Sequence, residues 1–420
     1  MRTITGHGDP AVQHAFALLL VLLPLAPALV PLAVVLLAVA VIRLRWRSTG
    51  ARWRLEAGDG SLPLMAAYYA LHVVGMAWTT NLAFGAFDLE VKAAFLLFPV
   101  LAVVLPARAA VDARPLLTVF VLANAVAAWL CLLLAAWAIA AERLHPRTGA
   151  AEIGLGHLFE SRFAHFLHPS YMALYSVFAL VIWMFSGAWR QAGRRGHAAV
   201  VVPLTAAVVL SNSKMGWITL VVVLLHGAWH FRRDRTMRRA LVGGLLAGAL
   251  GFAALFATAR PVRLKVLQAF EATQGFDPAS DRSSDLRRMT WSVGLDLLRA
   301  HPMTGVGTGD IKDELHAESA RRGYVHVVDK RLNAHSQFVQ SGIALGWPGL
   351  MLCAAMLLMP LLAAVRGRRP VAAAFVYLVL LNATVESLLE VQAGVVFLAA
   401  FAFLFHLTHA HDPVQSAAHR

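Results

Sequence analysis

Long apolar blocks recur along this chain, and they limit its possible folds more than any other feature. Residues 11–42 are almost wholly apolar, and similar blocks follow at intervals as far as residue 408. Each block supplies the roughly 20 apolar residues that a helix needs to cross a bilayer. Only 14% of the 420 residues are charged, whereas soluble domains carry about 25%. The pattern predicts an all-α polytopic membrane protein with about 12 transmembrane helices.

The apolar blocks divide the chain into three parts. Residues 1–258 are predicted to hold the first nine or so transmembrane helices, joined by short loops. Residues 259–335 form one long polar segment that mixes both charge signs, and we expect this segment to be folded. Residues 336–420 are predicted to hold the last three or so helices, beginning with a continuous one over 336–364, and a cytoplasmic tail.

Arginine gathers in short tracts between the apolar blocks, which accounts for the net charge of +14 without nucleic acid as a partner. Such tracts are typical of cytoplasmic loops beside anionic lipid, whereas loops longer than about 60 residues escape this bias. The alternation of helices then places residues 259–335 outside the cytoplasm and both termini inside it. The tracts include Arg43, Arg45 and Arg47; Arg194 and Arg195; Arg232, Arg233 and Arg235; and Arg366, Arg368 and Arg369.

The long polar segment contains a predicted helix followed by a glycine string. Trp291, Leu295 and Leu298 have helical spacing, and Pro302 should end that helix. Residues 305–309 read Gly-Val-Gly-Thr-Gly, and glycine lets backbone N–H groups approach a phosphate. The string lacks a preceding strand and a Walker lysine, so a turn after the helix is the favoured interpretation.

His335 is the residue that we favour for proton transfer. It closes the polar segment just before an apolar helix, where the partial positive charge of a helix N-terminus disfavours imidazolium. A neutral imidazole there can accept a proton from an alcohol. A single histidine at a helix boundary is more often a structural cap, and the chain has 18 histidines, so the interpretation depends on its neighbours.

Lys214 lies in a minimal turn between two apolar blocks, on the same predicted face as the polar segment. A cation close to the hydrocarbon is costly and commonly has a function. A lysine that simply extends to the headgroups is an equal alternative. Arg162 lies on the same predicted side, in a polar loop that precedes another apolar block.

Two pairs of carboxylates adjoin the apolar blocks. Asp88 and Glu90 fall in a predicted short loop and could bind a divalent cation, but two carboxylates alone do not define a site, and no metal is predicted. Glu386 and Glu390 lie near the outer end of a predicted helix. We expect them to pair with cations from the polar segment, because a carboxylate beside hydrocarbon needs compensation.

Three stretches, taken in order, resemble the O-antigen ligase and polymerase superfamily of bacterial envelope glycosyltransferases. Residues 211–214, Ser-Asn-Ser-Lys, look like its Ser-x-Ser-Arg motif, with Lys214 where the family usually has arginine. Residues 287–309 are similar to its arginine–tryptophan–proline–glycine signature. Residues 333–338, Asn-Ala-His-Ser-Gln-Phe, are similar to its histidine motif. The single large late loop makes the resemblance to the ligases closest.

The resemblance implies a GT-C type fold in the bacterial inner membrane, among membrane lipids, with the active site on the periplasmic side and no cofactor. Ligases transfer O-antigen polysaccharide from undecaprenyl pyrophosphate to lipid A–core oligosaccharide. On this resemblance we expect His335 to be the general base and Arg287 to be a catalytic clamp on the pyrophosphate. The residues expected to bind substrate are Lys214, Arg288, Arg162 and Gln337.

Other functions fit parts of the same pattern. O-antigen polymerases and protein O-oligosaccharyltransferases share the motif text and stay open as alternatives. A secondary transporter is an alternative of a different class, and it predicts an inverted repeat with ionisable groups near mid-membrane. The sequence has no clear internal repeat, and its candidate residues gather on one predicted face.

Overall fold

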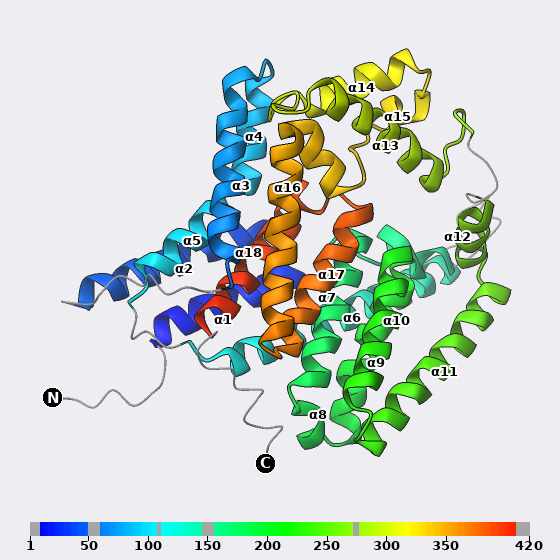
Figure 1. The fold of residues 1–420 in the computed structure, drawn as a ribbon. Helices are drawn as coiled ribbons and strands as arrows, with labels where there is room; N and C mark the ends of the chain where they lie inside the picture. The colour runs from blue at the N-terminus through cyan, green and yellow to red at the C-terminus, as the bar shows by residue number, and fades with distance from the viewer. Residues whose placement is uncertain (1–8, 49–58, 107–110, 145–154, 272–276, 409–420) are drawn as a thin grey trace. The chain divides into compact units, whose positions relative to one another are not determined.

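Every regular element in the part of the chain that the structure describes is a helix (Figure 1). The structure, a computed structural model, describes residues 9–48, 59–106, 111–144, 155–271 and 277–408. The all-α prediction is confirmed within these ranges, while the number of membrane spans stays a prediction. Four of the helical segments are long and apolar enough to cross a membrane, namely Pro27–Arg47, Ala113–Glu142, Arg235–Thr258 and Gln337–Arg366.

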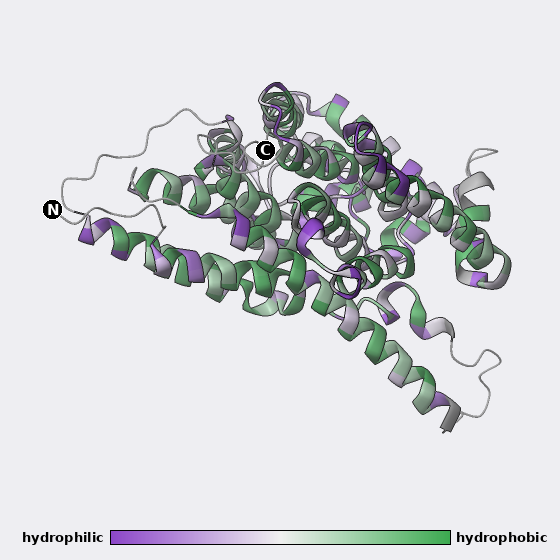
Figure 2. Cartoon of the chain, turned by 90° about the horizontal axis from the view of Figure 1, so that it is seen from below, coloured by the Kyte–Doolittle hydropathy of each residue, from purple (hydrophilic) through white to green (hydrophobic). Residues whose placement is uncertain are grey.

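Large apolar side chains remain on the surface of the helices. On α11 (Arg235–Thr258), Leu246 is 63% exposed and Leu250 is 73% exposed. Figure 2 shows hydrophobic residues along most of the helical chain. Exposure of apolar surface to water costs about 25 cal/mol per Å², so a surface of this kind is stable when lipid covers it. The helices therefore have the surface of a membrane protein.

Internal contacts divide the chain into two units. Unit 1 consists mainly of residues 41–111 and 268–412, and unit 2 consists mainly of residues 8–40 and 112–267. The turn at residues 211–214 lies in unit 2. The histidine motif and the glycine string lie in unit 1, so the three stretches of sequence resemblance are shared between the units.

The helices of unit 2 carry different groups at their two ends. At one end Arg190 Nη2 lies 3.6 Å from Asp234 Oδ2. At the other end Asn212 Nδ2 donates a hydrogen bond of 3.0 Å to Glu160 Oε1. The membrane orientation stays a prediction, and both chain termini lie outside the described residues. The elements of unit 2 are α1 (Pro10–Leu25), η1 (Pro27–Leu29), most of α2 (Val30–Arg47), α6 (Ala113–Leu144), η3 (Leu155–Leu158), η4 (Glu160–Arg162), α7 (Pro169–Phe185), α8 (Ala188–Gln191), α9 (Arg194–Leu210), α10 (Lys214–His230), α11 and most of α12 (Arg260–Glu271).

Unit 1 contains a helix, α4 (Leu82–Lys92), where the charges predict a short loop. Asn81 begins the helix by accepting a 3.0 Å hydrogen bond from the Phe84 N–H, and Lys92 bonds to Asp88 one turn earlier. The charges that resemble a loop therefore stabilise a helix. The other elements of unit 1 are α3 (Ser61–Gly75), η2 (Met76–Trp78), α5 (Ala94–Val104), α13 (Ser283–Ala300), α14 (Ile311–Arg321), α15 (Val325–Asp329), α16 (Gln337–Arg366), α17 (Pro370–Val385), η5 (Leu388–Glu390) and α18 (Gln392–Leu407).

The helix α16 is interrupted at Gly346 (φ 67°, ψ −158°), in contrast to the continuous helix predicted over 336–364. A Cβ atom built on Gly349 would lie 2.6 Å from the Ser341 carbonyl oxygen. In a straight helix the two residues would be about 12 Å apart, so the chain folds back at Gly346. Residues 337–345 form a half-helix about 14 Å long, which is too short to cross a hydrocarbon layer of about 30 Å.

The glycine string closes the end of this half-helix. The N–H groups of Val306 and Gly307 donate to the carbonyls of Ile343 and Ala344, at 2.8 and 3.0 Å. These carbonyls lose their helical partners at the break and would otherwise be unsatisfied. A Cβ on Gly305 (φ 64°) would lie 2.3 Å from the Ala344 oxygen, so glycine is needed for close approach. The turn interpretation is thus confirmed, and these N–H groups are already bonded within the protein.

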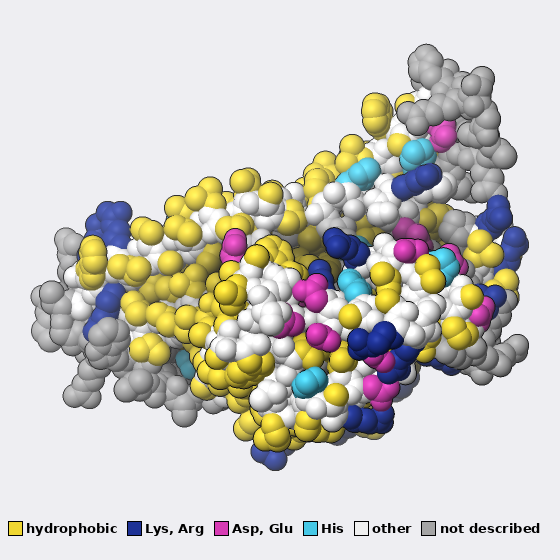
Figure 3. All heavy atoms as spheres, turned by 90° about the horizontal axis from the view of Figure 1, so that it is seen from above, with side chains coloured by type: hydrophobic (Ala, Val, Ile, Leu, Met, Phe, Trp, Pro, Cys, Tyr) yellow, Lys and Arg dark blue, Asp and Glu magenta, His cyan; other side chains and the backbone are white. Residues whose placement is uncertain are grey.

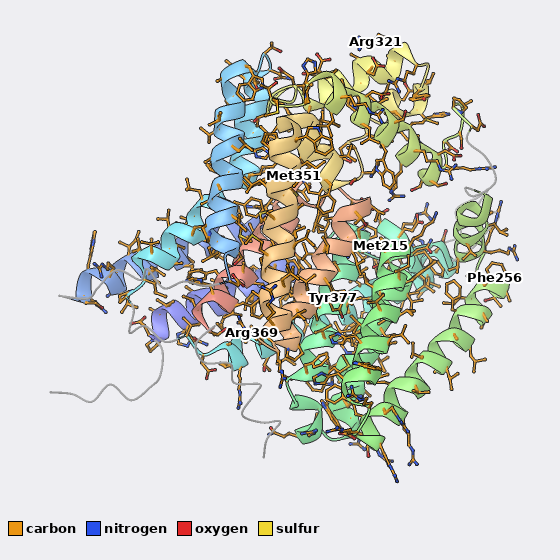
Figure 4. The ribbon with its side chains drawn as sticks, in the orientation of Figure 1. Met215, Phe256, Arg321, Met351, Arg369 and Tyr377 are labelled. Carbon is orange, nitrogen blue, oxygen red and sulfur yellow. The ribbon has the colours of Figure 1, made fainter. Side chains whose placement is uncertain are left out.

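The two ends of unit 1 also differ in character. Figure 4 shows Arg321, on α14, at one end of the unit and Arg369 at the opposite end, with Met351 of α16 between them. Charged and histidine side chains gather on the face seen in Figure 3, which is the end that carries α13 to α15. On this face Arg322 bonds to Asp296 and Glu318 at 2.9 and 2.7 Å, and these hydrogen bonds lower the pKa of both carboxyl groups.

Candidate active site

Arg287 and His335, the two residues predicted to be catalytic, meet at the side chain of Glu386. Arg287 Nη2 lies 2.9 Å from Glu386 Oε1, and His335 Nδ1 lies 3.6 Å from Glu386 Oε2. α13 supplies the arginine, the connection before α16 supplies the histidine, and the residue after α17 supplies the glutamate. The side chains are 21%, 25% and 23% exposed, in that order. Together they form a cation, a carboxylate and an imidazole that solvent or substrate can partly reach.

The backbone at His335 adopts a left-handed conformation with φ of 47°. A side chain in this region costs about 1 kcal/mol and persists only when its surroundings fix it. Asn333 Oδ1 accepts a 3.0 Å hydrogen bond from the His335 N–H. From α13, Trp291 Nε1 donates to the His335 carbonyl at 3.4 Å, and Thr290 Oγ1 donates to the Ala334 carbonyl at 3.2 Å. The tryptophan of the sequence signature therefore helps to hold the histidine in place.

The two ring nitrogens of His335 have different surroundings. Nδ1 is buried and has no hydrogen-bond partner among the described residues, so the exposed part of the side chain lies elsewhere on the ring. Glu386 Oε2 is just beyond hydrogen-bond distance, and a small approach would form an N–H···O bond to Nδ1. A carboxylate that keeps the proton on Nδ1 leaves Nε2 as the acceptor, as in Ser–His–Asp triads. The arrangement suits general base catalysis oriented by Glu386.

The Arg287 guanidinium is fixed by three neighbours. Nε donates to the Val385 carbonyl at 3.1 Å, Nη1 donates to Ser283 Oγ at 2.5 Å, and Nη2 reaches Glu386. A guanidinium has more N–H donors than these bonds use, so it can also bind phosphate oxygens. Arg288 is exposed, and as the next residue along α13 it points in another direction. Arg287 is therefore the member of this pair that joins the Glu386 group.

Gln337 is fully buried behind His335, although it is predicted to bind substrate. Its Nε2 lies 3.3 Å from Glu390 Oε1, and its Oε1 accepts a 2.7 Å hydrogen bond from the Leu389 N–H. Glu390 also bonds to Lys92 Nζ at 3.1 Å, and Lys92 bonds to Asp88. The Gln337 side chain therefore bonds to protein groups, and its binding of substrate stays a prediction.

Asp88 and Glu90 do not act together as a cation site. Asp88 is 3% exposed and bonds to Lys92, whereas Glu90 lies exposed on α4. Side chains two residues apart on a helix do not face each other. Within the described ranges no group of three or more histidine, cysteine, aspartate or glutamate side chains could hold a metal ion.

Lys214 and Arg162, both predicted to bind substrate, lie at the same end of unit 2. Lys214 is the first residue of α10, and Ser213 Oγ caps this helix by accepting a 3.2 Å hydrogen bond from the Gly216 N–H. The bond from Asn212 to Glu160 holds η4, which ends at Arg162, beside the same turn. A helix N-terminus disfavours a further cation and favours an anion. An anion that bound to this end of α10 would therefore relieve the repulsion at Lys214.

Glu386 and Lys92 are the residues whose roles the sequence did not reveal. The expected pairing of Glu386 with a cation from the polar segment is confirmed by its bond to Arg287, but its approach to His335 is not predictable from sequence. The expected partner of Glu390 is wrong, because the cation comes from α4 and not from the polar segment. An ionisable residue at the edge of an apolar block is the signal that singled out Glu386, and the same signal could have identified Lys92.

These features define a helical protein with a membrane-type surface, in which an imidazole, a carboxylate and a guanidinium lie together. Residues 198–354 match the family described as O-antigen ligase, which confirms the resemblance over this range. Members of the family are glycosyltransferase-like enzymes, and the family implies a lipid-linked glycan and a lipid-anchored acceptor as substrates. The matched range includes Lys214, Arg287 and His335, whereas Glu386 lies beyond it. No curated protein matches the chain.

Proposed function

We propose that this protein is an O-antigen ligase. It transfers O-antigen polysaccharide from undecaprenyl pyrophosphate to lipid A–core oligosaccharide, on the periplasmic face of the bacterial inner membrane. The observation that carries the proposal is the meeting of His335 and Arg287 at Glu386. The family match supports the wider superfamily, and the single large polar segment before His335 favours the ligase within it.

The proposed reaction is a single displacement at the anomeric carbon of the donor sugar. His335 Nε2 accepts the proton of the acceptor hydroxyl while that oxygen forms a bond to the anomeric carbon. The bond from this carbon to the pyrophosphate oxygen breaks, and the lipid diphosphate leaves with the electron pair. Attack opposite the leaving group inverts the anomeric configuration.

Arg287 is proposed to stabilise the charge that develops on the diphosphate. A cation that is already fixed by Glu386 and the Val385 carbonyl does not need to reorganise during the reaction. Arg288, on the same helix, is proposed to supply further positive charge for phosphate oxygens. Arg162 and Lys214, in unit 2, are proposed to bind substrate through their own positive charge. On this proposal fixed side chains take the part that a divalent metal has in many glycosyltransferases, and no cofactor takes part.

Lys214→Arg should keep most of the activity, because arginine retains the charge and adds a fork that can bind two phosphate oxygens. Lys214→Gln should lower turnover about 10- to 100-fold, since the charge is lost. Turnover of purified protein in lipid nanodiscs measures both effects. Lys330→Gln is the control, because it makes the same change at an exposed lysine just after α15. An inactive but folded Lys214→Arg protein would show that Lys214 does not act by binding phosphate.

The proposed function is tested by lipopolysaccharide gel analysis of a strain that lacks this protein. Loss of a ligase leaves O-antigen on its lipid carrier and removes the ladder on lipid A–core, and the intact gene restores the ladder. Loss of a polymerase would leave single O-antigen units attached to lipid A–core. A normal ladder would contradict both functions.

A further inference from the structure

A buried charge cluster lies behind the candidate site in unit 1. Lys92 is 0% exposed, and its ammonium bonds to Asp88, which is 3% exposed, and to Glu390, which is 10% exposed. Isolated charges are expensive in such surroundings, and removal of one partner of a buried pair is strongly destabilising. The cluster is not among the reacting groups described above, so the presence of these costly buried charges needs a separate explanation.

A chain of hydrogen bonds leads from this cluster to His335. Lys92 Nζ donates to Glu390 Oε1 at 3.1 Å, and Gln340 Nε2 donates to Glu390 Oε2 at 3.2 Å. Gln340 Oε1 then accepts a 3.1 Å hydrogen bond from the Ala334 N–H. Ala334 immediately precedes His335, whose left-handed backbone must be held by its surroundings.

The same cluster holds the segment that carries Glu386. Gln337 binds the Leu389 N–H and Glu390 Oε1, at 2.7 and 3.3 Å, so residues 386–390 are tied to the start of the half-helix. Glu390 thus connects the Ala334 backbone, through Gln340, to the Leu389 backbone, through Gln337. Both connections end within three residues of the 3.6 Å approach of His335 to Glu386.

We infer that Lys92, Glu390 and Gln340 are positioning residues that set the geometry between His335 and Glu386. The inference rests on the proposed function, because it assigns these residues to the same reaction. A displacement of about 1 Å in a reacting group can cost on the order of 100-fold in rate. A cluster that served only to stabilise the fold would change the amount of folded protein but leave the turnover of each folded molecule unchanged.

The direction of the hydrogen bonds gives a specific test. Glu390→Gln places the new amide N–H of residue 390 against the Gln340 N–H, so the hydrogen bond between the two residues is lost. If either amide turns to restore this bond, another hydrogen bond in the series from Lys92 to Ala334 is broken. Gln340→Glu leaves Ala334 bonded but sets two carboxylates against each other. The double exchange, Glu390→Gln with Gln340→Glu, keeps the net charge and restores the chain, with the bond between residues 340 and 390 reversed.

Each single variant should lower kcat about 10- to 100-fold with little change in KM for the lipid-linked donor. The double exchange should recover most of that loss. The measurement is turnover in nanodiscs with purified lipid-linked O-antigen and lipid A–core, corrected for the folded fraction found by thermal unfolding. Gln392→Glu is the matched control, since it makes the same chemical change at the start of α18, outside the chain of hydrogen bonds.

Normal kcat in a folded single variant would overturn the inference, and so would a folded double exchange that remains as slow as the single variants. If a single variant does not fold, the double exchange alone decides the matter. His335→Asn separates the two levels of the proposal. Near-normal transfer by folded His335→Asn protein would remove His335 as the base and this inference with it, and no transfer by the wild-type protein would remove the proposed function itself. An inactive His335→Asn protein beside a fully active Gln340→Glu protein would remove only this inference.

Discussion

Replacing His335 with asparagine should abolish glycan transfer while the protein still folds and inserts into the membrane. Loss of a general base typically costs about 100- to 10,000-fold in rate. Asparagine is the preferred replacement because it tolerates the left-handed conformation, φ 47°, that His335 adopts. His335→Ala should also be inactive, but it combines the chemical change with backbone strain. The rate of transfer from lipid-linked O-antigen to lipid A–core measures the effect.

The control for this prediction is His301→Asn. His301 is exposed at the end of α13 in the same unit, and its substitution should leave the rate near that of the wild type. Thermal unfolding and chromatographic behaviour show whether each variant is folded. If folded His335→Asn protein transfers glycan at a near-normal rate, His335 is not the base and the proposed mechanism fails.

Replacing Arg287 with alanine should reduce turnover about 100- to 1,000-fold, because a fixed cation is lost from the place where charge develops on the diphosphate. Arg321→Ala is the matched control. Arg321 bonds to Glu318 on the exposed face of α14, and its side chain is 65% exposed, so its loss should have little effect. Equal losses in the two variants would mean that the positive charge of the polar segment acts without regard to position.

A second variant distinguishes binding of the diphosphate by Arg287 from an indirect effect of Arg287 on Glu386. Arg287→Ala also leaves Glu386 without its guanidinium partner, and an uncompensated carboxylate could disturb His335 by itself. Adding Glu386→Gln removes this stray charge. If Arg287 clamps the diphosphate, the double variant is slower than Glu386→Gln alone by about the factor that separates Arg287→Ala from the wild type. Equal turnover of the double variant and Glu386→Gln alone would show instead that the role of Arg287 is to neutralise Glu386.

Local sequence patterns predicted the parts of this fold that depend on neighbouring residues. The helical spacing from Trp291 to Leu298 predicted α13, which the structure confirms over Ser283–Ala300. The same kind of pattern was misleading at Asp88 and Lys92, where charge suggested a loop. There the side chains are one helical turn apart and pair with each other, so they stabilise the helix.

By itself the sequence determined the helical, membrane-like character of the described residues, and its motifs led to the prediction of His335 as the base, since long apolar blocks and short motifs are local properties. Only the tertiary structure decided which groups meet. Arg287 and Glu386 are 99 residues apart, and Lys92 and Glu390 are 298 apart, so no local pattern records either contact. The break at Gly346 also depends on tertiary contacts, because backbone groups of Pro302, Val306 and Gly307 bond to the chain around it and replace the lost helical partners.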